Sequence, residues 1–120
     1  GGPVFNFRSE GRDFADSKRC LIPASGFYEF TGKKYPKTKH RFSLIGAPFM
    51  AIAGLWREAQ GNHPASFTML TTSPGPDVAP YHDRQVVVLQ PDNWADWLRL
   101  TKPQGELLKP TGRGLPCNCS

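Results

Sequence analysis

Long apolar runs, a cysteine framework and a helix-rich composition are all missing from this chain of 120 residues. No stretch approaches the roughly 18 consecutive apolar residues of a membrane-spanning helix. The opening GGPVFNFRSE has neither the basic nor the apolar region of a secretory signal peptide. We therefore expect a soluble, cytoplasmic protein. Twelve glycines and twelve prolines also argue against a helical bundle, because they interrupt the sequence at intervals typical of short strands and turns.

Cysteine is scarce, and the few cysteines exclude several site types. Cys20 lies within an apolar stretch, and Cys117 and Cys119 lie in the tail GLPCNCS. An odd count without further ligands at suitable spacing predicts no disulfide framework, no metal site and no cofactor. We expect Cys20 to be a core residue and the tail pair to be exposed thiols. The absence of a Ser-His-Asp or zinc motif argues against a peptidase that acts on other proteins.

The residues that are present predict one β-rich domain over 1–120, with 38% hydrophobic content. Alternating apolar residues and β-formers predict strands at 4–8, 19–22, 27–30, 40–45, 49–59, 66–72 and 84–90. We expect 19–22 and 27–30 to pair through a turn at 23–26. Residues 73–80 hold too much proline for a regular element, and 91–100 predicts a helix with a core-facing stripe formed by Trp94, Trp97 and Leu98.

One carboxylate stands in an aromatic strand. In GFYEF, Glu29 shares a strand face with Phe27, while Tyr28 and Phe30 share the other face. An inward carboxylate among apolar neighbours costs several kcal/mol, roughly, unless it is paired or protonated. Glu29 is therefore either exposed at a sheet edge or part of a working site.

Positive charge dominates and gathers in one segment. The formal net charge is +5, which favours polyanionic partners. The segment 32–41, GKKYPKTKHR, concentrates basic residues around Tyr35, among them Lys33, Lys34 and Lys37. It is either a solvated hairpin tip or an electrostatic funnel for nucleic acid.

Four polar residues stand beside aromatic or apolar strand residues: Asn6, Arg8, Glu29 and His82. Each has an ordinary explanation, such as a capping histidine or an arginine paired at the rim. Together, Glu29 and His82 would form an acid/base pair beside an amide and a guanidinium that can hold phosphate. Spacing alone does not show that they meet.

The blocks NFRSEG, RCLIPASGFYEF, AIAGLWRE, FTMLTT, APYHDRQVVVL and the W-x-x-W-L helix resemble, in this order, the SOS-response-associated peptidase (SRAP) family. The resemblance implies an α+β fold whose mixed antiparallel sheet is barrel-like, with a few short helices and a basic channel for single-stranded DNA. In that family an N-terminal cysteine condenses with the aldehyde of an abasic site and closes a thiazolidine.

Residue by residue, the resemblance assigns a role to each matching position. Asn6 and Arg8 would hold the DNA backbone, and Glu29 would transfer protons at the amine and in self-cleavage of the N-terminus. His82 would assist ring opening of the sugar, and Arg84 would meet a phosphate. With the DNA role, the expected location extends to the bacterial nucleoid.

Two departures from the family pattern stand out. HDRQVV places Gln85 and Val86 where the family has Met and Pro, a change that we expect the fold to tolerate. No nucleophilic cysteine precedes NFRSE, and internal cysteines lack the free α-amine that a thiazolidine requires. We expect an N-terminally truncated fragment that is less stable than its parent or self-associates. The alternatives are a degenerate relative that does not crosslink and a noncovalent single-strand binding module.

Overall fold

The computed structural model describes residues 5–31, 38–43, 49–80, 84–110 and 117–119; for some strand residues, including Asn6 and Glu29, it describes the backbone alone. The fold is α+β and β-rich, as predicted. The larger sheet contains β1 (Phe5–Arg8), β2 (Arg19–Ala24), β5 (Met50–Arg57), β6 (Ser66–Thr72), β7 (Gln85–Val86) and β8 (Val88–Leu89). The smaller sheet contains β3 (Phe27–Thr31), β4 (Thr38–Phe42) and β9 (Cys117–Cys119).

The larger sheet is mixed. Its path runs β1-β6-β5-β2, in which β1 is parallel to β6 and the other neighbours are antiparallel. This arrangement confirms the predicted mixed sheet. Among the described strands, β1 and β2 end the path, so the sheet stays open instead of closing into a barrel.

The predicted strand over 84–90 is two short strands that part at Val87. β7 pairs with the end of β6, and β8 pairs with the beginning of β5. Val87 joins both neighbours, because its N–H donates to Leu70 O at 2.9 Å and its carbonyl accepts from Ala53 N at 2.9 Å. Residues 85–89 therefore fill a fork where β5 and β6 separate.

Two apolar clusters cover opposite faces of the larger sheet. One joins Leu70, Val87 and Leu89 to the helical side through Trp97 and Leu107. The other joins Ile52, Val86 and Val88 to Phe27 and Phe42 of the smaller sheet, whose rings stack at 5.2 Å. Alternate residues of 86–89 thus supply both clusters, as the period of a strand requires.

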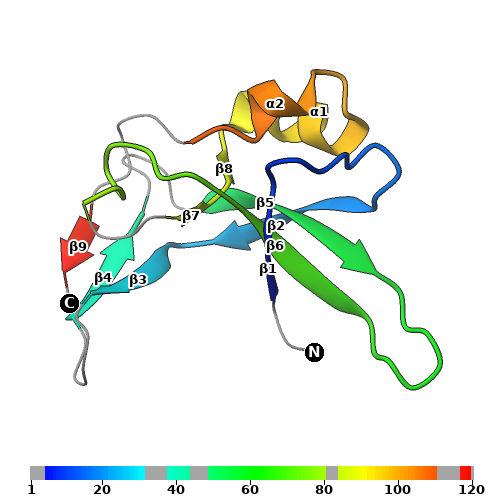
Figure 1. Cartoon of the computed structure of the whole chain (residues 1–120), viewed down its shortest axis with the longest axis horizontal. Helices are drawn as coiled ribbons and strands as arrows, with labels where there is room; N and C mark the ends of the chain where they lie inside the picture. The colour runs from blue at the N-terminus through cyan, green and yellow to red at the C-terminus, as the bar shows by residue number, and fades with distance from the viewer. Residues whose placement is uncertain (1–4, 32–37, 44–48, 81–83, 111–116, 120) are drawn as a thin grey trace.

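The helices lie together on one side of the larger sheet (Figure 1). A 3-10 turn (Pro91–Asn93) precedes α1 (Trp94–Arg99), and α2 (Gln104–Leu107) follows. Trp97 is fully buried and its Nε1 donates to Cys20 O at 3.0 Å, as its predicted core position suggests. Leu98 is 44% exposed, so the predicted stripe is wrong at this position. The six-residue helix ends at Arg99, and its C-cap Leu100 has a left-handed backbone. A helix of this length is too short to bury a wide face.

The predicted hairpin between 19–22 and 27–30 does not form. β2 pairs with β5, whereas β3 pairs with β4 in the other sheet. Pro23 lies within β2, because an edge strand can spare the N–H that proline lacks. Only Ser25 and Gly26 separate the strands, and they carry the chain from one sheet to the other.

Arg19 ties the edge strand β2 to the helical side. Its guanidinium donates to five backbone carbonyls at 2.7–3.2 Å, those of Phe14, Ala15, Ser17, Trp97 and Leu98. Its neighbour Cys20 is half-buried rather than deep in the core, and burial raises the pKa of its thiol. No helix within the described ranges has the length and apolar character needed to cross a membrane.

Candidate functional site

Strand β1 carries the first two predicted site residues. Aromatic and polar residues alternate along FNFR, and its parallel pairing with β6 sets Asn6 opposite Met69 and Arg8 opposite Thr71. The side chain of Arg8 is exposed, as a phosphate-binding residue would need to be. After Arg8 the pairing continues, because Ser9 N donates to Thr71 O at 2.9 Å.

Thr71 connects β1 to the segment that follows His82. Its hydroxyl donates to Phe7 O at 3.3 Å and accepts from Arg84 Nη2 at 2.9 Å. Thr71 is buried, so these bonds satisfy a hydroxyl that has little access to water. Arg84 is thereby held against the same strand end that presents Arg8.

The stronger link is an ion pair between Arg84 and Glu10. Nη1 and Nη2 donate to the two carboxylate oxygens at 2.9 Å each, a bidentate geometry. The hydrogen bonds from Arg84 are the main reason that the pKa of Glu10 is lowered to about 2. Glu10 therefore stays ionised throughout the neutral range, and it fixes the guanidinium two residues after His82.

The structure brings together part of the predicted constellation. Arg8 and Arg84 lie in one region, where β1 and β6 end, because Arg8 is in register with Thr71 and Arg84 bonds to Thr71. Asn6 lies two residues before Arg8 in β1, in register with Met69. Glu29 lies in β3 of the smaller sheet, in register with His40, and its side chain is outside the description. His82, Lys33, Lys34 and Lys37 also lie outside the described residues.

Arg84 has a different immediate partner from the predicted one. A phosphate was expected at its guanidinium, whereas in the structure Glu10 and Thr71 occupy donors on both terminal nitrogens. The sequence predicts no role for Glu10 or Thr71. The sequence places this glutamate two residues after Arg8, in the turn that follows β1.

Gln85 has hydrogen-bond partners at both ends of its side-chain amide. It is buried, its Oε1 accepts from Gly75 N at 2.8 Å, and its Nε2 donates to Val86 O at 3.3 Å. Gly75 belongs to the proline-rich loop 73–80. The side-chain amide of Gln85 therefore bonds this loop to the segment 85–89. A buried amide with these partners avoids the penalty of an unpaired polar group.

Metal-ligating side chains are not clustered in the part of the chain that the structure describes. Nowhere among the described residues do three His, Cys, Asp or Glu side chains gather as a metal ion would require. Glu10 and Arg84 pair with each other and hold a fixed geometry, and the exposed Arg8 is a cation suited to binding an anion.

Comparison with known proteins assigns the family. Residues 6–116 match the family described as SOS response associated peptidase (SRAP), and the chain belongs to this family. Two Bacillus subtilis relatives are the abasic site processing proteins YoqW, 40% identical over 87 residues, and YobE, 39% identical over 87 residues. Each alignment covers 68% of this chain, but 38% of YoqW and 39% of YobE.

More distant relatives extend the similarity. The abasic site processing protein YMR114C of Saccharomyces cerevisiae is 29% identical over 91 residues, which are 72% of this chain and 24% of that protein. This chain therefore spans well under half the length of these relatives.

Solved structures support the fold. A protein from Bordetella bronchiseptica has a TM-score of 0.74 at 28% identity, covering 96% of this chain and 64% of that one. A protein from Bacteroides thetaiotaomicron has a TM-score of 0.75 at 20% identity, with 95% and 57% coverage.

Proposed function

We propose that this SRAP chain binds single-stranded DNA and that the complete protein joins covalently to abasic sites through an N-terminal cysteine. The observation that carries the proposal is the Glu10–Arg84 pair, which holds the segment after His82 against the strand of Asn6 and Arg8. Two sequence blocks 74 residues apart thus form one region. The names of the relatives, abasic site processing proteins, support the same substrate.

The proposed chemistry needs an amine and a thiol on adjacent carbons. The α-amine of an N-terminal cysteine attacks the aldehyde of the ring-opened abasic sugar and forms an imine with loss of water. The thiol then adds to the imine carbon and closes a five-membered thiazolidine. Because both groups belong to one residue, the second step is intramolecular and the adduct outlasts a simple imine.

The chain's own residues take supporting roles in this proposal. Arg8 and Asn6 hold the DNA backbone beside the sugar. Glu29 accepts and returns the proton of the amine, and His82 assists ring opening because its charge changes near neutral pH. The DNA strand is attracted by the positive charges of Lys33, Lys34 and Lys37. Self-processing of the N-terminus would use Glu29 as well.

Crosslinking to an abasic oligonucleotide tests the proposal. An extended chain that begins with cysteine is expected to give an adduct that survives denaturing electrophoresis, and the same chain beginning with serine is the matched control. Glu29→Gln is expected to slow adduct formation while DNA affinity stays nearly unchanged. Arg8→Ala is expected to weaken binding about tenfold, the value of one charge-assisted hydrogen bond. Absence of an adduct from the cysteine form would refute the covalent function.

A noncovalent single-strand binding module is the second candidate, and the net charge of +5 favours it. It predicts salt-dependent binding that is indifferent to abasic sites. Equal affinity for intact and abasic oligonucleotides, without any adduct, would select this candidate.

A further inference from the structure

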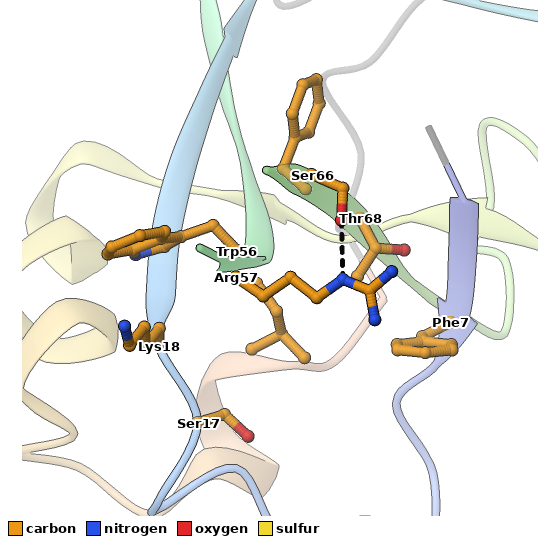
Figure 2. Close-up of a pocket in the computed structure, with 9 residues that line it drawn as sticks. Phe7, Ser17, Lys18, Trp56, Arg57, Ser66 and Thr68 are labelled. Carbon is orange, nitrogen blue, oxygen red and sulfur yellow. Dashed lines mark hydrogen bonds between the residues drawn. The ribbon is translucent and has the colours of Figure 1, made fainter. Parts of the chain in front are cut away.

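A pocket opens beside β1, β5 and β6, separate from the region of Arg8 and Arg84 (Figure 2). Its apolar walls include Phe7, Leu55 and Phe67, and cations line it at Lys18 and Arg57, beside three hydroxyl-bearing residues. The residues come from strand β1, from the turn before β2 and from the facing ends of β5 and β6. None of the described lining residues is a carboxylate, so the pocket has one sign of charge.

Three aromatic rings are exposed at this pocket. The exposed fractions of Phe7, Trp56 and Phe67 are 40%, 42% and 40%. Aromatic residues of this size are usually more buried. Trp56 and Phe67 are opposite each other in the β5–β6 ladder and share one face of the sheet. Phe7, in register with Leu70, lies on the other face, together with Leu55 and Arg57. The exposed ring that shares a face with Arg57 is therefore Phe7.

Cations accompany the rings. The Nζ of Lys18 lies 4.5 Å from the ring centroid of Trp56, and the guanidinium carbon of Arg12 lies 4.8 Å from that of Phe7. Arg57 Nε donates to Ser66 Oγ at 3.0 Å, and Figure 2 shows the rest of its guanidinium reaching toward Phe7. This bond orients the guanidinium of Arg57, which stays at the pocket.

One carboxylate stands close by. Glu58 pairs with Lys18 at 3.3 Å, but the side chain of Glu58 is 71% exposed. An ion pair so open to water contributes little to stability, and its side chains can rearrange around an incoming anion. Glu58 therefore does not cancel the positive charge of the pocket.

We propose that this pocket is a strand-holding subsite in which a base of single-stranded DNA stacks on Phe7 and the adjoining phosphate meets Arg57. The inference rests on the proposed DNA-binding function and extends it to a second surface. Adjacent strand residues point to opposite faces, so Phe7 and Arg8 address different sides of the sheet. An exposed ring beside a cation on one face suits a polynucleotide, since every base has a stacking face and every nucleotide a charge.

Fluorescence anisotropy with labelled oligo(dT) tests the subsite on this chain. Phe7→Leu keeps an apolar side chain but removes the ring, and we expect the affinity to fall about fivefold or more. Arg57→Gln is expected to weaken binding and to lower the slope of log affinity against log salt by about 0.7, the contribution of one phosphate on a single strand.

Matched controls are available elsewhere on the surface. Phe49 is 44% exposed outside the pocket, and Arg99 is an exposed cation at the end of α1, so Phe49→Leu and Arg99→Gln make the same chemical changes. Both controls should leave the affinity and the salt slope near those of the unsubstituted chain. Thermal unfolding of all four variants identifies any that fail to fold. If Phe7→Leu fails to fold, the comparison of Arg57→Gln with Arg99→Gln decides, because Arg57 is exposed.

The outcomes separate this inference from the proposed function. If the unsubstituted chain binds oligo(dT) and the pocket variants bind as tightly as the controls, the subsite is overturned and the DNA-binding proposal stands. If the unsubstituted chain does not bind, the DNA-binding proposal fails and the subsite fails with it. A dimer in sedimentation velocity that Phe7→Leu abolishes, with unchanged DNA affinity, would assign the pocket to a second copy of the chain instead.

Discussion

Glu10 and Arg84 form two parallel hydrogen bonds of 2.9 Å, one to each carboxylate oxygen. The pair joins the turn after β1 to the residue that precedes β7, and Thr71 of β6 completes the link. Loss of either charge would therefore disturb two sequence blocks that the proposed function needs in one place.

A double-mutant cycle on this pair is the first prediction. We expect Glu10→Gln and Arg84→Gln to be coupled by about 1 kcal/mol in the free energy of unfolding, the upper end for pairs open to solvent. The side chain of Glu10 is 52% exposed, so a larger value is not expected. Urea unfolding of the two single variants and the double variant measures the coupling, and strict additivity would contradict the link.

The second prediction concerns pH. The pKa of Glu10 is lowered from 4.5 to about 2, so its contribution to stability is complete above pH 4.5 and is lost as the pH falls toward 2. The stability difference between the unsubstituted chain and Glu10→Gln should therefore shrink across this window, by about 1 kcal/mol after allowance for solvent screening. Unfolding curves at pH 6, 4, 3 and 2 check this, and a difference independent of pH would be evidence against it.

The third prediction contrasts two glycines. A Cβ on Gly54 would lie 2.5 Å from Ile22 Cδ1 and 2.8 Å from Thr68 O, so Gly54→Ala should destabilise the fold by about 1–3 kcal/mol. Gly105, in α2, has nothing within 4 Å of such an atom. Gly105→Ala should be neutral or stabilising by up to about 1 kcal/mol, because alanine favours a helix. Thermal melts of the two variants measure the contrast.

Arg19→Lys is the fourth prediction. An ammonium cannot reproduce the planar set of donors that reaches five carbonyls, so we expect a loss of about 1.5–3 kcal/mol in unfolding free energy. Arg99→Lys, at an exposed position at the end of α1, is the matched control and should change little. Equal stability of the two variants would show that the guanidinium geometry of Arg19 does not matter.

Local patterns predicted most of the strands but not their partners. SFTMLTT is β6 at both bounds, and β1 and β5 lie within their predicted ranges. The pairing of β2 with β5 does not follow from the local pattern, because Pro23 predicts a turn, whereas an edge strand accepts proline. Long-range pairing depends on which apolar faces meet in space, and neighbouring residues carry little information about this.

The candidate site, too, was predicted only in part from the sequence. The resemblance identified Asn6, Arg8 and Arg84, and the structure places Arg8 and Arg84 where β1 and β6 end, with Asn6 two residues earlier in β1. Glu10 was missed because a single carboxylate in a turn has many possible partners. Its distance to Arg84 is set by the register of β1 against β6, which only the assembled sheet determines.

The fork filled by residues 85–89 has a consequence for the order of folding. The two walls of the fork, β5 and β6, are consecutive strands of one antiparallel ladder and close a short loop, whereas the filling segment follows later in the chain. Contacts that close short loops cost less entropy. We therefore expect the β5–β6 hairpin to form first and the segment behind His82 to dock afterwards, so that pulse-labelled amides of Val87 and Leu89 become protected later than that of Leu55.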